Sequence, residues 1–235
     1  MVKNHLKRLA APQGWKIGRK EHVWVTRPMP GAHPIKECLT LDRVLKDLGY
    51  AKTAREVKFI LNNKDILVDK IVRKKKNFTV GLMDVIEVPK MEKSFRVSYN
   101  SKGEMVLIGI DNKEVSVKLL KVKSKTAVKK SKIHVGFHDG KSIVLDKAEM
   151  NVGDSVLYDM DKKSVVKTIP LEKGALILVI RGKQKGFQGV VKEIVERKGL
   201  TKASCNYEIG KETYSTLKDY VFVIGKGKSE VKLNE

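Results

Sequence analysis

Cysteine and long apolar runs are both scarce in this sequence. Among its 235 residues are two cysteines, Cys38 and Cys205, and neither lies in a Cys-x-x-Cys pair or beside clustered histidines. A disulfide framework and a zinc ribbon are therefore not expected. The longest apolar runs, 175–180 and 220–224, fall far short of the roughly 18 residues of a membrane-spanning helix. No hydrophobic signal core follows the basic N-terminus, so we expect a cytoplasmic protein with no membrane partner.

Acidic residues are also too few to balance the basic ones. The chain carries 49 Lys and Arg against 27 Asp and Glu, a formal net charge of +22. Its 41% hydrophobic residues are enough for packed cores, so the chain is expected to fold. A folded chain with this surplus repels itself unless a polyanion neutralises it, and nucleic acid is the predicted partner.

Residues 1–40 show neither a helical nor a strand period. The proline-rich run at 27–34 interrupts strand pairing and favours extended backbone. We interpret 1–40 as an extended basic arm, with a disordered tail as the alternative. Its two tryptophans are unusual in a disordered segment and suit stacking on bases. The candidate RNA contacts of the arm are Lys3, Lys7, Arg8, Trp15, Lys16, Arg19, Lys20 and Arg27.

The clearest helical pattern covers residues 40–62. Apolar residues at 41, 44, 45 and 48 share one helix face, Thr40 can cap the start, and Gly49 suits a left-handed end. A second helix is predicted from the Thr53-to-Glu56 capping box to the asparagines at 62 and 63. The two short helices should form a hairpin.

The remainder of the chain is predicted to form strands. Short β-branched runs lie at 66–68, 78–80 and 85–88. Further on, pairs of apolar runs flank turn residues, which predicts hairpins over 95–108, 133–145 and 155–169. A series of short hairpins protects its edges by closing, so the middle third is predicted to be antiparallel and barrel-like.

Segment 121–132 contains six lysines and no acidic residue. Such a run can be merely a solvated face, but in a chain already so basic it favours phosphate contact. Lys129 and Lys130 are its candidate RNA contacts.

Residues 41–57, followed by the strand at 66–69 and by Gly81-Leu82-Met83-Asp84, resemble the S-four-type RNA-binding module. The resemblance implies two helices packed on a small sheet, with basic residues presented to RNA. The sequence has Asp69-Lys70 where that family usually has Asn-Gly, which questions the tight turn there. The candidate contacts are Arg43, Lys46, Lys52, Thr53, Arg55, Lys58, Lys70, Arg73, Lys74, Lys75 and Lys76; the alternative is a helix pair that is merely soluble.

Residues 174–191 resemble a KOW motif, in which two apolar strands flank a glycine-rich basic loop. Glycines let such a loop fold tightly and bring its backbone close to a ligand. The motif occurs in ribosomal proteins and in transcription elongation factors. Its candidate residues are Arg181, Lys183 and Lys185, with the loop glycines Gly182, Gly186 and Gly189.

In this order, and behind an arm that contains Gly14-Trp15-Lys16-Ile17-Gly18-Arg19-Lys20, these features resemble the S-four-e family of ribosomal proteins. The resemblance implies a single-copy, non-catalytic protein bound to small-subunit ribosomal RNA and neighbouring ribosomal proteins. The predicted fold is α+β and mostly β. Its expected domains are the arm (1–40), an S-four-type module (41–92), a central β domain (93–171) and a KOW-containing, SH3-like barrel domain (172–235).

Catalytic readings of the sequence fail. His134 and His138 flank a predicted strand and lack the glutamate of a metalloprotease, and no Ser/His/Asp or Cys/His set is recognisable. No metal, cofactor or small-molecule substrate is expected. Two rival hypotheses remain: an RNA-modifying enzyme that carries an S-four-type module, and a KOW-type elongation factor.

Overall fold

The computed structural model describes residues 4–128, 132–146, 149–196, 202–210 and 212–233. The chain divides into two compact units. Unit 1 comprises Met1–Ser98 and Glu104–Ser116, and unit 2 comprises Tyr99–Gly103 and Val117–Asn234. The four domains expected from the sequence are a finer division, and their bounds stay a prediction.

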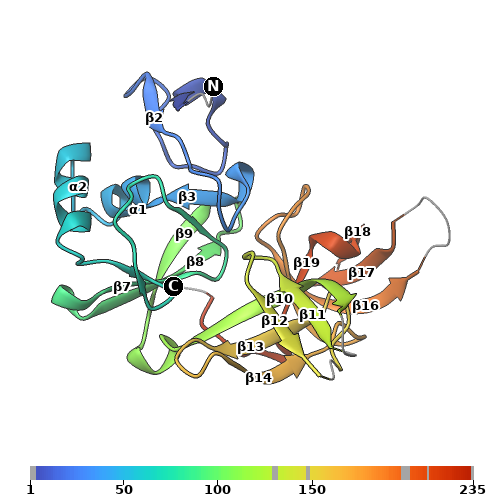
Figure 1. Cartoon of the computed structure of the whole chain (residues 1–235). Coiled ribbons are helices and arrows are strands. Elements are labelled where there is room, and N and C mark those ends of the chain that lie inside the picture. The colour runs from blue at the N-terminus through green and yellow to red at the C-terminus, as the bar shows by residue number, and fades with distance from the viewer. Residues whose placement is uncertain (1–3, 129–131, 147–148, 197–201, 211, 234–235) are drawn as a thin grey trace. The chain divides into compact units, whose positions relative to one another are not determined.

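The helix pair of unit 1 forms where the sequence indicated it (Figure 1). Helix α1 spans Leu41–Asp47 and helix α2 spans Ala54–Asn62. The Thr40 hydroxyl accepts a hydrogen bond from the Arg43 amide at 3.3 Å, and Thr53 and Glu56 form the reciprocal capping box. Gly49 has the predicted left-handed backbone. Among the described residues, no helix is long and apolar enough to cross a membrane.

Apart from short 3-10 helices, the remaining secondary structure described in unit 1 consists of strands. They form the sheets β1-β2, β3-β6 and β5-β4-β7-β8-β9, the last of which includes the predicted β8–β9 neighbours. The bounds are β1 His5–Lys7, β2 Trp24–Thr26, β3 Cys38–Thr40, β4 Leu67–Val68, β5 Ile71–Val72, β6 Thr79–Gly81, β7 Val85–Val88, β8 Lys93–Tyr99 and β9 Met105–Ile110. The helix pair contributes Val44, Leu45, Val57 and Leu61 to the core, all fully buried.

The N-terminal segment is more folded than the expected extended arm. Strands β1 and β2 pair antiparallel, with Lys7 opposite Trp24. Trp15 is buried and its indole Nε1 donates a hydrogen bond to the Cys38 carbonyl at 2.7 Å; Ile17 is buried beside it in sequence. Burying these two apolar side chains offsets the entropy of ordering the segment.

The tight turn after β4 forms although this chain has Asp69-Lys70 where the family usually has Asn-Gly. Leu67 pairs with Val72 and Val68 with Ile71, which leaves Asp69 and Lys70 as a two-residue turn. Both have positive φ, 51° and 64°, as a type I′ turn requires. Asp69 is also held by β7, because its amide donates to the Val85 carbonyl at 2.9 Å.

Unit 2 begins with a sheet of order β12-β11-β10-β13-β14. Both hairpins predicted here are confirmed, since β11 pairs with β12 and β13 with β14. The central strand β10 was not predicted, because the lysine run at 121–132 was interpreted as a site of phosphate contact, with a solvated face as the alternative. The bounds are β10 Val117–Ala127, β11 Ile133–Phe137, β12 Ser142–Leu145, β13 Ser155–Asp159 and β14 Ser164–Ile169.

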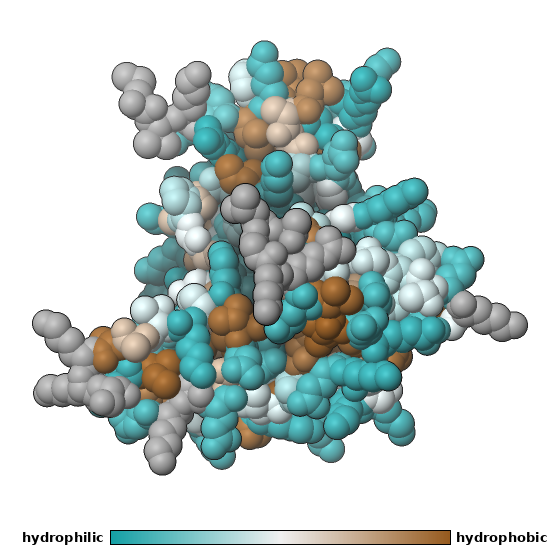
Figure 2. Space-filling model, turned by 90° about the vertical axis from the view of Figure 1, so that its right-hand side faces the viewer, coloured by the Kyte–Doolittle hydropathy of each residue, from teal (hydrophilic) through white to brown (hydrophobic). Residues whose placement is uncertain are grey.

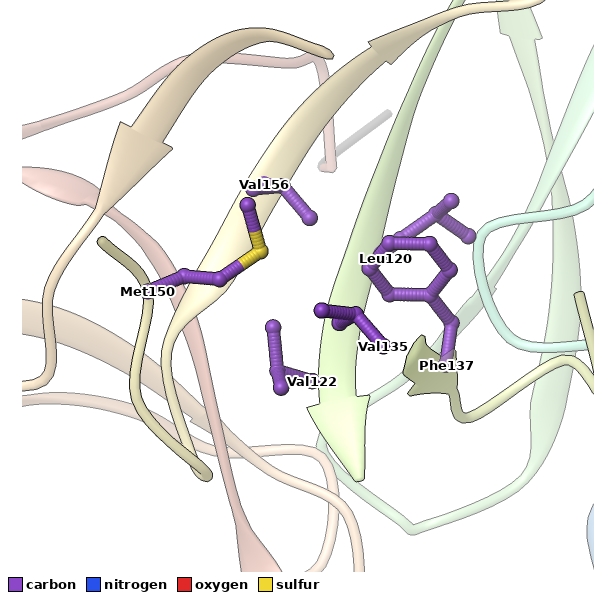
Figure 3. Close-up of a cluster of buried hydrophobic side chains, with 6 residues drawn as sticks. All are labelled: Leu120, Val122, Val135, Phe137, Met150 and Val156. Atoms are coloured by element: carbon purple, nitrogen blue, oxygen red, sulfur yellow. The ribbon is translucent and has the colours of Figure 1, made fainter. Parts of the chain in front are cut away.

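Strand β10 supplies the centre of a buried apolar cluster (Figure 3). In Figure 3, side chains of β10, β11 and β13 and of the loop before β13 point toward one another. Because β10 pairs with both β11 and β13, it brings the two hairpins onto one core. The cluster consists of Leu120, Val122, Val135, Phe137, Met150 and Val156.

The second sheet of unit 2 has the order β18-β17-β16-β15-β19-β20. Strands β15 and β16 flank the expected KOW loop and pair antiparallel, with Leu176 opposite Val190. The α+β, mostly β fold class is thus confirmed. The bounds are β15 Ala175–Val179, β16 Gln188–Val195, β17 Ser204–Ile209, β18 Glu212–Leu217, β19 Val221–Lys226 and β20 Lys228–Ser229.

The strained turn predicts an unusual effect of glycine. Lys70→Gly and Lys70→Ala both remove the Lys70–Glu87 ion pair, whose Nζ and Oε2 lie 3.0 Å apart, but only glycine relieves the left-handed backbone. We expect Lys70→Gly to be about 1 kcal/mol more stable than Lys70→Ala. Urea unfolding followed by circular dichroism measures the difference. Equal stabilities would show that the turn carries no strain.

Candidate nucleic-acid interface

Basic residues gather around hollows of unit 1. On the face in Figure 2, hydrophilic side chains predominate and hydrophobic ones form separate patches. A hollow of about 520 Å³, which we call the hairpin groove, lies where residues of the N-terminal hairpin meet those of the helix pair. Its lining comprises Asn4, Ile17, His22, Trp24, Val25, Thr26, Arg27, Asp42, Arg43, Lys46, Lys52, Thr53, Ala54, Lys76 and Asn77.

Ion pairs within α1 occupy two of the groove's cations. The Nζ of Lys46 lies 2.9 Å from a carboxylate oxygen of Asp42, and the Nε of Arg43 lies 3.0 Å from one of Asp47. Burial raises the pKa of Asp47 although Arg43 counteracts it. By contrast, Lys52 and Lys76 are exposed and make no side-chain ion pair within the described chain. These two lysines are the most available to phosphates.

A second hollow, which we call the Arg73 hollow, has a volume of about 630 Å³. The Arg73 guanidinium carbon lies 4.3 Å from the centroid of the Phe78 ring, an arrangement that orients its planar donor groups. Its buried Nε has no hydrogen-bond partner in the described structure. Such a guanidinium can bind a phosphate through two parallel hydrogen bonds. The lining residues are Met29, Lys64, Val72, Arg73, Lys74, Lys75 and Phe78.

The expected KOW loop is shaped mainly by contacts inside unit 2. Gly182 and Gly186 have φ of 93° and 92°, which favour glycine. A Cβ at Gly186 would collide with the Asn100 carbonyl, and one at Gly189 with the Glu208 carbonyl. Glycine is therefore required at both positions by packing within the protein, in line with the tight folding expected of this loop; its close approach to a ligand stays a prediction.

Side chains of this loop also contact aromatic rings of unit 2. The Nζ of Lys185 lies 4.0 Å from the centroid of the Tyr99 ring, and the Arg181 guanidinium carbon lies 5.9 Å from that of Tyr220. Arg181 and Lys183 are both exposed, whereas Lys185 is half-buried; Lys183 makes no aromatic contact within the described residues. Of the three cations predicted here, Lys183 is the best placed to meet RNA.

Several other candidate residues have clear positions. Arg8 donates its Nε to the Ile17 carbonyl at 3.1 Å, and so helps to fold the N-terminal segment. Lys70 pairs with Glu87. The exposed candidates are Lys7, Lys16, Arg19, Lys20, Arg55 and Lys58. Three further candidates, Lys3, Lys129 and Lys130, lie outside the described residues.

The lysine-rich segment 121–132 is not a uniform cationic face. Lys121 is 8% exposed, and its Nζ donates to the carbonyls of Asp219 at 2.8 Å and Val221 at 2.7 Å. This lysine therefore joins β10 to the segment that leads into β19. Lys123 and Lys125 are exposed. A regular strand would place these three lysines on one face, but the register shift between Val122 and Ser124 interrupts the strand between Lys121 and the other two.

The two tryptophans have opposite environments. Trp15, a predicted RNA contact, is 3% exposed and hydrogen-bonded within unit 1, so its ring is not available for base stacking. Trp24, which was not among the candidate contacts, is 55% exposed and lines the hairpin groove. The amino-acid composition of the segment could not tell the buried tryptophan from the exposed one. The strand at 24–26 is also too short for its alternation to show which tryptophan faces solvent.

The two cysteines and His138 are held by their surroundings. Burial raises the pKa of Cys38 to about 12 and that of Cys205 to about 11, so both thiols stay protonated near neutral pH. The His138 ring packs edge-on against Phe222, and its Nδ1 accepts the Lys121 amide at 3.2 Å. Cations around open hollows are the arrangement typical of a nucleic-acid-binding protein.

Comparison with known families agrees with this class. Residues 2–36 match the RS4NT (NUC023) domain, residues 39–86 match the S4 domain, and residues 91–165 match Ribosomal family S4e. These matched ranges include strands β1 and β2, the helix pair and most of β10–β14.

Relatives match along nearly the whole chain. The small ribosomal subunit protein eS4 of Methanosphaera stadtmanae is 39% identical over 232 residues, covering 98% of this chain and 96% of the relative. That of Methanocaldococcus jannaschii is 40% identical over 241 residues, covering 98% of each. The crystal structure of the 30S ribosomal protein S4e from Thermoplasma acidophilum aligns with a TM-score of 0.71 at 31% identity, covering 81% of this chain and 96% of that one.

The chain belongs to the ribosomal S4e family. It is therefore a structural ribosomal protein and not an enzyme. The resemblance inferred from the sequence motifs is confirmed.

The different roles of the tryptophans predict different costs of replacement. Trp15→Phe leaves the buried Cys38 carbonyl without its donor and is expected to cost about 2 kcal/mol of unfolding free energy. Trp24→Phe changes an exposed ring and should cost less than about 0.5 kcal/mol. Urea unfolding by circular dichroism compares the two variants. Equal losses would contradict the assignment of Trp15 to the core.

Proposed function

We propose that this ribosomal protein binds small-subunit ribosomal RNA mainly through the hairpin groove and the Arg73 hollow of unit 1. The observation that carries the proposal is the set of exposed lysines around these hollows, which make no side-chain ion pair within the described residues. Lys183 of the loop between β15 and β16 adds a contact from unit 2. Phosphate charge would supply the affinity, and the fit of the hollows to folded RNA the specificity.

The electrostatics of unit 1 are sufficient for such binding. Each cation that neutralises a phosphate releases condensed counterions, so affinity falls with salt by a slope of about 0.7 to 0.9 per contact. The six cations available at the two hollows allow about half a dozen such contacts. They are Lys52, Lys64, Arg73, Lys74, Lys75 and Lys76.

The proposal includes the setting of the protein. A single copy would sit in each small subunit, in contact with ribosomal RNA and neighbouring ribosomal proteins, on cytoplasmic ribosomes. The names of the relatives support this setting. Neither a membrane nor a small-molecule substrate forms part of it.

Of the two rivals, the RNA-modifying enzyme is contradicted by membership in a family of structural ribosomal proteins. The KOW-type elongation factor shares only the glycine-rich loop with this chain, whereas the relatives match it along almost its full length. The position of the protein in the cell separates the remaining possibilities.

Sedimentation of a lysate tests that position directly. In a sucrose gradient with high magnesium, the protein is expected to sediment with small subunits and whole ribosomes, as judged by immunoblotting. Removing magnesium should shift it toward lighter fractions together with the unfolding particle. Accumulation in light fractions at high magnesium would contradict a ribosomal location.

Neutralising two lysines of the Arg73 hollow tests the proposed surface. Lys74→Gln/Lys75→Gln removes two phosphate contacts and should lower the salt slope of binding to small-subunit ribosomal RNA by about 1.5. Filter binding between low and moderate salt measures it. The matched control is Lys162→Gln/Lys163→Gln, an adjacent lysine pair at an exposed turn of unit 2 that is no candidate contact. Equal slopes for both variants would place the RNA elsewhere.

A further inference from the structure

An exposed aromatic ring stands in the wall of the basic hairpin groove. Trp24 is 55% exposed and lines this groove. Its ring lies 5.4 Å from that of His5 between centroids, and the Nζ of Lys7 lies 5.9 Å from its centroid. His5 and Lys7 are two residues apart in β1 and therefore share one face of the strand. Trp24 lies directly opposite Lys7 in β2, so its side chain is on the same face. The ring is therefore supported by its neighbours while much of its surface stays open.

The groove around the ring has the size and charge for one nucleotide. Its volume of about 520 Å³ lies within the roughly 300–1,000 Å³ of small-ligand sites. The acidic wall residue Asp42 is already compensated, because one carboxylate oxygen accepts from the Thr26 hydroxyl at 2.8 Å and from Lys46 at 2.9 Å. Lys52 and Lys76 thus remain for phosphates. Asn4 and Asn77 add amide groups of the kind that bind base edges.

We propose that the hairpin groove holds a single unpaired nucleotide of the RNA, whose base stacks on Trp24 while Lys52 and Lys76 neutralise the adjoining phosphates. This inference rests on the proposed function and specifies what the groove recognises. A paired base could not use the ring, because its faces are covered by its neighbours in the duplex. Bulged or looped-out bases, in contrast, stack readily on aromatic side chains.

A protein partner fits the groove less well. Cations are the available charged groups here, and lysine is depleted at the centre of protein interfaces, where its ammonium would lose water without a partner. The combination of an open aromatic ring with cations spaced around it is instead the usual arrangement of single-stranded nucleic-acid sites.

The test uses the full-length protein and three RNA hairpins that share the same stem sequence. One is fully paired, one carries a single bulged adenosine, and one carries an abasic residue at the bulge. The wild type should bind the bulged-adenosine hairpin about tenfold more tightly than the abasic one. Trp24→Ala should abolish this preference, and Trp24→Phe should retain most of it. The affinity for the fully paired hairpin should be the same for all three proteins.

Leu9→Ala is the matched control, since Leu9 is 77% exposed in the same segment and does not line the groove. It should keep the wild-type preference. A second readout is tryptophan fluorescence: the bulged hairpin should protect Trp24 from acrylamide, whereas Trp15 is buried with or without RNA.

The outcomes separate this inference from the proposed function. If the wild type binds ribosomal RNA with the expected salt dependence but Trp24→Ala keeps the bulge preference, the inference is overturned and the proposed function stands. A loss of affinity for all three hairpins alike would also overturn it, because Trp24 would then support the fold or contact the backbone. If the wild type binds no RNA, the proposed function itself fails.

Discussion

The surplus of positive charge is the constraint on which the rest of this structure depends. With a formal net charge of +22, the chain must either pair its cations internally or leave them for a polyanion. It does both. Lys118 is fully buried with its Nζ 3.0 Å from an Asp139 oxygen, and Lys121 donates to backbone carbonyls. A lysine buried without a partner is strongly destabilising, and Lys118 and Lys121 each have partners of their own.

The same division explains the candidate interface. Arg43 and Lys46 are held by carboxylates one helical turn away, which keeps α1 intact beside the groove. Arg73 is held by the face of Phe78, a contact that orients the guanidinium without neutralising it. Exposed lysines beside these fixed groups carry charge at little structural cost. The fixed side chains therefore give the basic surface a defined shape, while the exposed lysines keep it positively charged.

Local features were predictable from sequence because their causes are local. Thr40, Gly49 and the Thr53–Glu56 box act within one or two helical turns, and each has the predicted conformation. Strand β10 was missed because its lysines were interpreted by their charge and not by their spacing, and burial of Lys118 depends on Asp139, 21 positions away. At the turn after β4, tertiary pairing imposed positive φ on Asp69 and Lys70, which local preference disfavours.

By itself, the sequence determined that this protein is basic and mostly β, that a helix pair opens its RNA-binding module, and that it belongs with the S4e ribosomal proteins. Charge, capping residues and motif order are properties of residues near one another in the chain. Only the tertiary structure decided that Trp15 is a core side chain and Trp24 an open one. Exposure depends on which distant residues pack against a ring, and no local pattern distinguishes two tryptophans that both lie in a basic, aperiodic segment.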